Sequence, residues 1–300
     1  MSEEKPNPVF QFRSLLLGPF SVPGLGGKLF TASLFALLTL LTQVGGLALW
    51  PIFGTIYRYS RLFPFLKRIL FRTVTLGIAY LVVCQTVVPL TAHMMGRTRL
   101  PIFATESLPT GPLHIGYTLL NRTYVQAHTY QAYTEAVRRF GKKHPGITVR
   151  YLDAGFPFET IPLLPHLSHS DGQRIDVAFL FESEGKHIDR ALSPIGYWGY
   201  AKESRPRSEC AGSTRKLGPL RVSLRWDFAP LQVLWPSFTL DRKHTRALFR
   251  ELAKDTRVCS ILLEPTLHKI LNAPKLSSNP CNVARHDDHF HLSIKKRCRK

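Results

Sequence analysis

Apolar residues are unevenly distributed along the chain, with two long stretches near the N-terminus that lack Asp, Glu, Lys and Arg. These are Leu29–Ile56, with the core LFTASLFALLTLLTQVGGLALW, and Thr73–Met95. Each is longer than the roughly 20 residues that a helix needs to cross a bilayer. Buried core helices are the alternative, but they seldom run this long without a charge. A cleaved signal peptide does not fit, because a second apolar stretch follows the first. The pattern predicts two transmembrane helices, at about residues 29–50 and 73–95.

The segment between the two stretches, residues 54–72, is short and basic. It contains Arg58, Arg61, Lys67, Arg68 and Arg72. Short loops rich in Lys and Arg remain on the cytoplasmic side of a membrane. We therefore expect residues 1–96 to form a membrane anchor with a cytoplasmic loop and with both ends outside. Residues 97–300 are then expected to form a domain in the periplasm or outside the cell.

The outer domain mixes helical and alternating patterns without a regular order. Helical spacing predicts one helix over Tyr117–Phe140, stopped by Gly141, and another over Asp241–Asp255, capped by Asp241. Alternating, β-branched runs predict four strands. The strands are Ile147–Leu152, Arg174–Phe181, Val258–Leu263 and Asp288–Ile294. The Pro- and Thr-rich residues Arg97–Pro112 are expected to be a linker. The pattern predicts an α+β fold with a mainly antiparallel sheet.

The formal net charge of +20 favours anionic partners. Nucleic acid, anionic lipid headgroups and acidic cell-wall polymers all fit this charge. A domain outside the cytoplasm would not meet nucleic acid, so that partner is not expected. Membrane lipids and wall polymers remain as the partners that the charge predicts.

Four cysteines lie in the outer domain, at Cys210, Cys259, Cys281 and Cys298. An even number in an oxidising compartment permits two disulfides, with three possible pairings. None of the four belongs to a Cys-x-x-Cys pair, so a cysteine zinc knuckle is not indicated. Cys84 lies within the second apolar stretch and is expected to be an inert apolar residue.

Five further residues of interest are histidines in two tight clusters, joined by one aspartate. The segment PHLSHSDGQRIDVAF contains His166, His169 and Asp176, and the segment RHDDHFHLSI contains His286, His289 and His291. Zinc hydrolases take three ligands from His and carboxylate side chains and leave one position for water. His289 and His291 are two apart in a predicted strand, so they should share one face of it. The two clusters together predict a metal site.

Neighbouring residues permit more than one interpretation. Arg174 should share the face of Asp176, where it would bind a substrate carboxylate or form a salt bridge with a nearby acid. Tyr197, Trp198 and Tyr200 could line a groove, although an aromatic loop that packs on the core is the preferred interpretation. Asp288 is expected to be structural.

The spacing of the two clusters resembles the LAS zinc metallopeptidases, and within them the penicillin-insensitive murein endopeptidase family. The resemblance lies in His166-Leu167-Ser168-His169, in Asp176, and in the segment from His286 to His291, which reads HDDHFH. Ser293 stands where that family has an arginine. The segments YLDAGFPF and SPIGYWGY also resemble a proteobacterial membrane-protein family.

The resemblance implies a Zn²⁺ site with His169, Asp176 and His291 as ligands. It also implies that His289 acts on the zinc-bound water or stabilises the oxyanion, and that His166 and His286 assist. The implied fold is a small antiparallel sheet with flanking helices.

The function expected from this resemblance is a zinc peptidase or amidase. It would be anchored in the bacterial inner membrane by two spans and would hydrolyse peptide bonds of peptidoglycan in the periplasm. The alternative is a non-catalytic, zinc-containing module that binds a component of the cell envelope. A zinc ion that serves only stability is disfavoured, since three ligands with histidines nearby indicate an open site.

Overall fold

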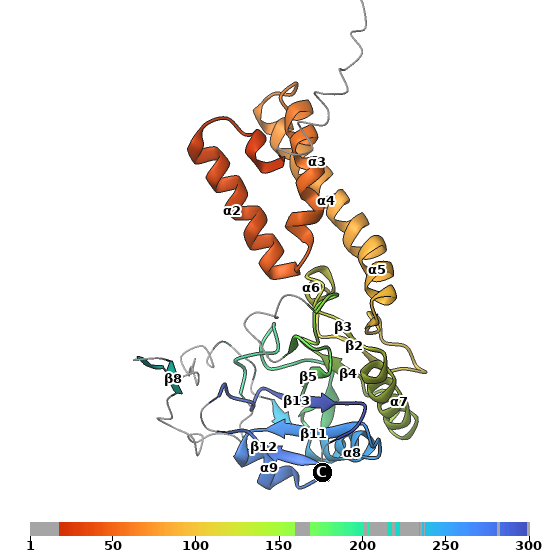
Figure 1. Cartoon of the computed structure of the whole chain (residues 1–300). Coiled ribbons are helices and arrows are strands. Elements are labelled where there is room, and N and C mark those ends of the chain that lie inside the picture. Colours follow the sequence, from red (N-terminus) through yellow and green to blue (C-terminus); the bar gives the residue numbers. More distant parts are fainter. Residues whose placement is uncertain are drawn as a thin grey trace, which may run out of the picture.

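The computed structural model describes residues 18–159, 169–200, 203, 215–217, 220–222, 234, 236, 238–280 and 283–298. A group of N-terminal helices stands on a larger domain that contains all the described strands (Figure 1). The domain combines helices with sheets, which confirms the α+β class.

The N-terminal helices are α2 (Leu25–Thr42), α3 (Gly45–Ser60), α4 (Phe65–Val82) and α5 (Val88–Met94). A π-helical turn, Val83–Val87, joins α4 to α5 and makes one continuous helical segment of 30 residues. Two segments are long and apolar enough to cross a membrane, α2 and the segment Phe65–Met94. Most of the residues of both remain exposed, as in helices that face lipid.

The first predicted span is two antiparallel helices, not one. The chain reverses at Gln43, whose φ of 69° lies in the left-handed region. Gly46 allows the close approach that follows, because a Cβ atom there would lie 2.0 Å from the carbonyl oxygen of Phe35. Figure 1 shows α2 running toward the domain and α3 running back. The start of α2 therefore lies at the same end as the α3–α4 connection, against the prediction that both ends of the anchor are outside.

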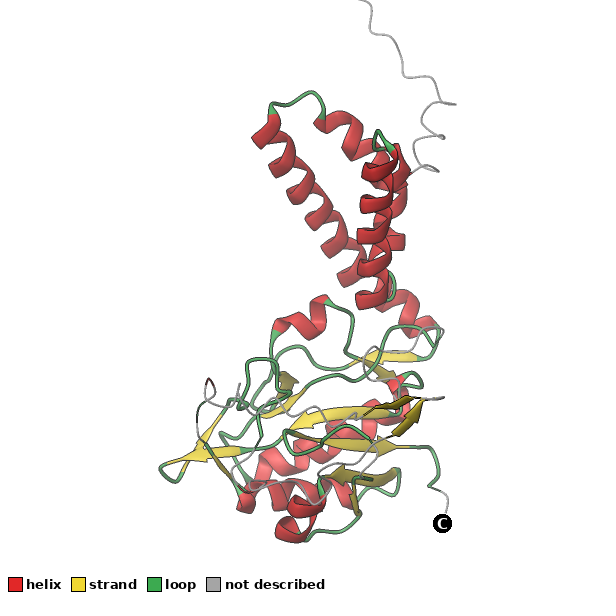
Figure 2. Cartoon of the chain, turned by 90° about the vertical axis from the view of Figure 1, so that its left-hand side faces the viewer, coloured by secondary structure: helices red, strands yellow, loops and turns green. Residues whose placement is uncertain are grey.

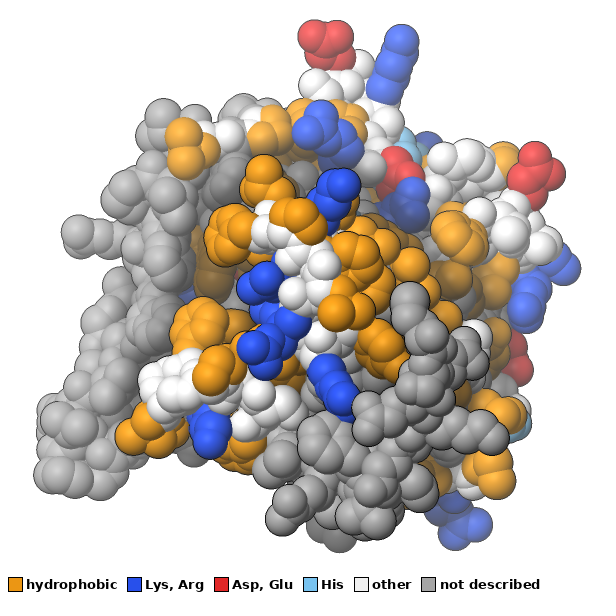
Figure 3. Space-filling view, turned by 90° about the horizontal axis from the view of Figure 1, so that it is seen from above, with side chains coloured by type: hydrophobic (Ala, Val, Ile, Leu, Met, Phe, Trp, Pro, Cys, Tyr) orange, Lys and Arg blue, Asp and Glu red, His pale blue; other side chains and the backbone are white. Residues whose placement is uncertain are grey.

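The basic connector between α3 and α4 lies at the end of the helices that is remote from the domain. Viewed from that end, Lys and Arg side chains stand among apolar ones (Figure 3). Arg61 and Lys67 are exposed there, beside the exposed apolar side chains of Leu62 and Leu66. This combination is typical of a loop at a membrane surface.

The centre of the domain is a six-stranded sheet with the order β12-β11-β13-β5-β4-β2. Its strands are β2 (Thr110–Pro112), β4 (Val149–Tyr151), β5 (Arg174–Ala178), β11 (Val258–Leu263), β12 (Leu276–Ser278) and β13 (His289–Ile294). The three inner pairs are antiparallel, whereas β11 with β12 and β2 with β4 are parallel. The sheet is therefore mixed, although the four predicted strands are all present. The predicted strand Arg174–Phe181 ends early, and Phe181–Ser183 (β6) belongs to another sheet.

Smaller sheets surround this centre. A three-stranded sheet contains β6, β7 (Lys186–Ile188) and β10 (Thr239–Leu240), and β8 (Arg215–Leu217) forms a hairpin with β9 (Leu220–Val222). The remaining pair is formed by β1 (Arg97–Arg99) and β3 (Tyr124–Gln126).

The two faces of the central sheet have different roles. Ile175 and Val177 of β5, with Phe290 and Leu292 of β13, belong to the hydrophobic core. Helices α7 (Ala127–Lys143), α8 (Arg242–Ala253) and α9 (Pro265–Leu271) supply the other side of that core (Figure 2). Because side chains alternate along a strand, the residues between them point to the opposite face. That face carries Asp176, His289 and His291.

The predicted helix Tyr117–Phe140 is interrupted. A short helix, α6 (Ile115–Leu119), precedes β3, and α7 begins only at Ala127. Asn121 adopts a φ of 56°, and the residues of β3 that follow it pair with β1. Gly141 does not stop α7, which continues to Lys143. Glycine is needed at this position because Pro109 occupies the space where a side chain would be. By contrast, α8 and its cap are as predicted, since Asp241 accepts a hydrogen bond from the His244 backbone N–H at 3.0 Å.

The predicted linker, Arg97–Pro112, is also part of the fold. It begins with β1, which pairs with β3, and it ends with β2 at an edge of the central sheet. The Arg97 side chain is buried. No flexible connection therefore separates the last turn of α5 from the domain.

A disulfide joins Cys259 on β11 to Cys298, which follows β13. Of the three pairings left open by the sequence, this fixes the partner of Cys259, and Cys210 and Cys281 lie outside the described residues. Cys84 is buried and not disulfide-bonded. A disulfide indicates an extracytoplasmic domain.

Replacing Cys259 and Cys298 together with alanine is expected to lower the free energy of unfolding by about 2 to 4 kcal/mol, because the bond closes a long loop of the unfolded chain. Thermal unfolding of the full chain with and without reductant measures this effect. Reductant should lower the melting temperature of the wild type more than that of the double variant. Equal shifts would show that this disulfide does not stabilise the domain.

Candidate metal centre

The pairing of β5 with β13 brings together residues that are 115 positions apart in the sequence. His291 lies directly opposite Asp176 in the antiparallel register. The Nδ1 atom of His291 is 2.8 Å from Oδ1 of Asp176. His289 points to the same face, as its spacing predicted, with Nε2 3.6 Å from the other carboxylate oxygen, Oδ2.

His169 reaches this face from the turn that precedes β5. Its Nδ1 atom is 2.9 Å from the carbonyl oxygen of Ala154. Since a carbonyl only accepts hydrogen bonds, Nδ1 carries the proton and Nε2 is left as a metal donor. That Nε2 atom lies 3.2 Å from Oδ1 of Asp176. The backbone at Ala154 thus selects the imidazole tautomer that a metal site requires.

The turn itself is fixed by contacts from β1 and β3. Arg97 donates to the carbonyl oxygen of Ser170 at 2.8 Å, and Gln126 donates to that of Asp171 at 2.8 Å. Gly172 has a φ of 66°, and a Cβ atom there would collide with the guanidinium of Arg97. The turn therefore needs glycine at this position.

His169, Asp176 and His291 fit a zinc ion. One donor atom from each lies within 4.8 Å of the others, and all three residues are buried. Ligand atoms about 2 Å from one tetrahedral zinc ion are roughly 3.3 Å apart. The observed separations of 3.2 Å and 2.8 Å from Asp176 Oδ1 are close to this value. Among the described residues, this is the group that could hold a metal.

The charges at the site suit a cation. Burial alone would raise the pKa of Asp176, but His169, His289 and the hydrogen bond from His291 hold it well below its ordinary value. Burial also lowers the pKa of His291, to about 4, although Asp176 opposes this shift. Asp176 is therefore ionised and His291 neutral near neutral pH, which are the forms that bind a metal. Burial opposes protonation of His169, but Asp176 outweighs it and raises the pKa of His169, so a bound metal would displace a proton from that ring.

His289 is held by a second carboxylate. Its Nδ1 atom lies 2.6 Å from Oδ1 of Asp288. Burial opposes protonation of His289, but Asp176 and Asp288 outweigh it and raise its pKa to about 9. Asp288, expected from the sequence to be structural, orients a histidine beside the candidate metal donors.

His286 completes the cluster. Its ring centroid is 4.9 Å from that of His289 and 5.9 Å from that of His291. Burial lowers the pKa of His286 well below its ordinary value, and the neighbouring histidines lower it further. His286 is half-buried, at the edge of the cluster. His166, expected to assist catalysis, lies outside the described residues.

The aromatic segment around Tyr197 is part of the site, not simply core packing. Its phenol donates to Oδ2 of Asp176 at 2.9 Å and accepts from the backbone N–H of Asp153 at 3.2 Å. The next residue, Trp198, donates its backbone N–H to Oδ2 of Asp288 at 2.5 Å. One loop thus holds both carboxylates of the site. Gly196 and Gly199 beside these aromatics were the signal in the sequence for a tight turn.

The phenol of Tyr197 directs Asp176. Since its oxygen accepts from Asp153, its proton is directed to Oδ2 of Asp176, and Oδ1 is the oxygen that faces His169 and His291. Replacing Tyr197 with phenylalanine keeps the ring packed on His289 but removes this contact. We expect the affinity for zinc to fall by about 10- to 100-fold, as for other residues that orient metal ligands.

Competition with a fluorescent chelator measures this loss. Tyr133→Phe is the matched control, because Tyr133 is also buried and hydrogen-bonded, to Thr110, but it lies in the hydrophobic core. The control should keep the wild-type affinity. An unchanged affinity in Tyr197→Phe would show that the tyrosine does not position Asp176.

Arg174 shares the face of Asp176, as predicted, and pairs in register with Ser293.

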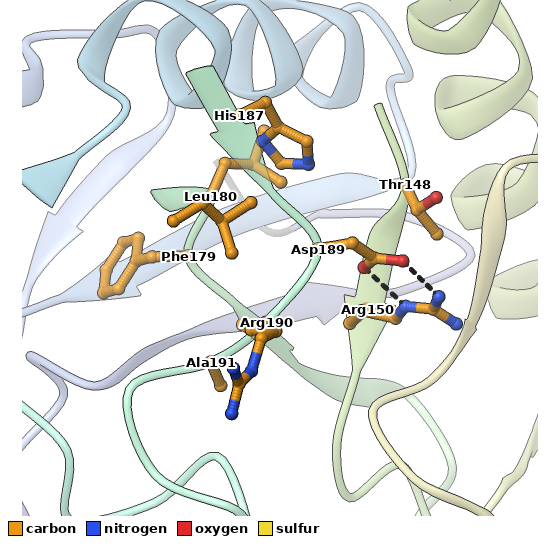
Figure 4. A pocket seen from close by; sticks show the side chains of 10 residues that line it. Thr148, Arg150, Phe179, Leu180, His187, Asp189, Arg190 and Ala191 are labelled. Carbon is orange, nitrogen blue, oxygen red and sulfur yellow. Dashed lines mark hydrogen bonds and ion pairs between the residues drawn. The ribbon is translucent and has the colours of Figure 1, made fainter. Parts of the chain in front are cut away.

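A small cavity of about 10 Å³, enough for about one water, lies away from the candidate metal centre, between Thr148, Phe179 and His187. Figure 4 shows Arg150 and Asp189 paired at its wall. None of the candidate metal ligands lines it.

The arrangement of buried donors is therefore a candidate metal centre with an oriented histidine beside it. Comparison with protein-family profiles and with curated protein sequences finds no match to this chain.

Proposed function

We propose that this chain is a membrane-anchored, zinc-dependent peptidase or amidase that acts on peptidoglycan peptides. The observation that carries the proposal is the buried group His169, Asp176 and His291, with His289 beside it. This set matches, residue by residue, the LAS pattern that the sequence resembles. Three protein ligands leave a position open for water or substrate, as in catalytic zinc sites.

The chemistry would be divided between a metal and the protein. A bound zinc ion supplies Lewis acidity and makes a coordinated water acidic. The protein supplies the proton transfer. His289, held by Asp288 and protonated near neutral pH, would stabilise the oxyanion, donate its proton to the leaving amine and recover one from the attacking water. Tyr197 holds Asp176 in place, and His286 lies beside His289 at the edge of the cluster.

The proposed location is the bacterial inner membrane, with the domain in the periplasm. The exposed apolar surfaces of α2 and of Phe65–Met94 support membrane insertion. The disulfide supports an oxidising compartment for the domain. The basic α3–α4 connection, at the far end, supports a cytoplasmic position for that end. The start of α2 lies on the same side, so the anchor consists of a helical hairpin and one long span.

Incubation of the full chain with purified muropeptides tests the proposal. We expect zinc-dependent release of new amino termini, lost after treatment with a chelator and restored by zinc. Bound zinc without cleavage of any muropeptide would contradict the peptidase. It would favour the alternative in which the same zinc site serves a non-catalytic module that binds the envelope.

A further inference from the structure

The metal centre is held at a fixed height next to the membrane anchor. Arg97 is two residues beyond Met95, the C-terminal cap of α5. Its side chain is only 1% exposed and donates to the carbonyl oxygen of Ser170, the neighbour of His169. The end of the membrane helix and the turn that carries a metal donor are therefore one connected structure.

A second group of contacts joins the α2–α3 turn to the domain. The side-chain amide of Gln43 makes two hydrogen bonds to the backbone of Phe158, at 2.6 Å and 2.8 Å. Asn121 donates to the carbonyl oxygen of Thr42 at 3.2 Å. In addition, the phenol of Tyr80 on α4 donates to the carbonyl oxygen of Leu119 at the end of α6. Several polar contacts thus fix the anchor to the domain.

These contacts limit the distance from the anchor to the metal centre. Phe158 lies four positions after Ala154, whose carbonyl oxygen contacts His169. A fully extended chain of this length spans about 14 Å, so with the two hydrogen bonds the site lies within roughly 20 Å of Gln43. Headgroups extend about 5 to 8 Å beyond the hydrocarbon core on each side of a bilayer. With Gln43 at the edge of the hydrocarbon core, the site therefore lies no more than roughly 12 to 15 Å beyond the headgroups.

The surface between the anchor and the site is partly apolar. The α6 helix lies directly below the anchor helices (Figure 1) and exposes 53% of Ile115. Its residue Tyr117 donates to the carbonyl oxygen of Ile195 at 2.5 Å, which connects α6 to the loop that holds Asp176. Ile195 and Trp198 on that loop are each 40% exposed. Exposed Trp beside a membrane is typical of the headgroup layer.

We propose that the substrate of this site is a membrane-attached peptide, presented at the bilayer surface by an apolar anchor of its own. This inference rests on the proposed membrane-bound metal centre. Within peptidoglycan chemistry it selects the peptide of a lipid-linked precursor over that of the distant polymer. A site fixed within roughly 20 Å of the anchor cannot reach a peptide that lies far from the bilayer. A lipid-attached peptide, by contrast, is concentrated at that height, as in any tethered pair.

Binding of membrane-attached ligands with spacers of different length tests the distance between the bilayer and the metal centre without requiring catalysis. The full chain is loaded with Co²⁺ in phosphatidylcholine nanodiscs, and binding of a hydroxamate to the metal is followed by the visible spectrum of cobalt. The hydroxamate is joined to a phospholipid by spacers of roughly 15, 40 and 80 Å, or it is free in solution. We expect the hydroxamate on the shortest spacer to half-saturate the cobalt site at a concentration at least about 100-fold lower than the free compound requires. The advantage should decrease as the spacer lengthens.

The control removes the membrane and leaves the chain intact. In a detergent that disperses the lipid-linked hydroxamates, all of them should bind cobalt with the same affinity as the free compound, whatever their spacer length. If the free hydroxamate binds in nanodiscs but lipid attachment gives no advantage, or only the longest spacer binds, the inference is overturned and the metal centre stands. If the full chain binds no Co²⁺, both the proposed function and this inference fail.

Discussion

Replacing Arg122 with methionine is expected to destabilise the domain by about 3 to 5 kcal/mol, because it separates a buried ion pair. The guanidinium of Arg122 donates to both carboxylate oxygens of Asp153, at 2.9 Å and 3.0 Å. Both residues are buried, so the Asp153 charge would lose this neighbour in a place with little access to water. Thermal unfolding of the full chain in detergent measures the loss.

The same substitution should also weaken metal binding. Asp153 precedes Ala154, whose carbonyl oxygen sets the tautomer of His169, and its backbone N–H donates to Tyr197. Arg150→Met is the matched control, because Arg150 forms its ion pair with Asp189 at the exposed surface. Exposed pairs contribute about 1 kcal/mol or less. Equal losses of stability in the two variants would contradict the structural role assigned to Arg122.

Replacing His289 with glutamine is expected to reduce hydrolysis by about 100- to 10,000-fold, which is the usual contribution of a general acid–base group. Zinc content should stay at the wild-type level, since His289 is not one of the three donors. The initial rate of muropeptide cleavage and the zinc content of the same preparation measure both quantities.

His268→Gln is the control for His289→Gln, because His268 lies on α9, outside the metal centre. It should retain both activity and zinc. Loss of zinc from His289→Gln would make His289 a ligand and would contradict the assignment. Full activity in that variant would remove His289 from the mechanism.

The candidate metal centre could be predicted from the sequence because its residues follow local patterns. His289 and His291 alternate with core residues on a strand that is apolar on its other face, and Asp176 alternates in the same way on β5. Once these strands pair, their polar faces coincide. The helix capped by Asp241 and the strand Val258–Leu263 were found by the same local reasoning.

The remaining differences arise from tertiary contacts that one-dimensional patterns do not contain. The uncharged run from Leu29 onward concealed the reversal at Gln43, after which Gly46 allows α3 to pack closely against α2. The segment after Arg97 resembled a linker, but pairing with β3 orders it. The role of Tyr197 depends on a hydrogen bond to Asp176 across 21 positions, and periodicity does not reveal such a contact.

Metal content is the most direct test of the central claim, that His169, Asp176 and His291 form a zinc site. The measurement is the zinc per chain in the purified full-length protein, compared with His169→Ala, His291→Ala and His187→Ala. His187 is a matched control, since it is also largely shielded from solvent but lies outside the candidate ligands. We expect one zinc in the wild type and in His187→Ala, and none in the other two variants. A folded wild type that takes up no zinc when it is supplied, or equal zinc in all four proteins, would contradict the account.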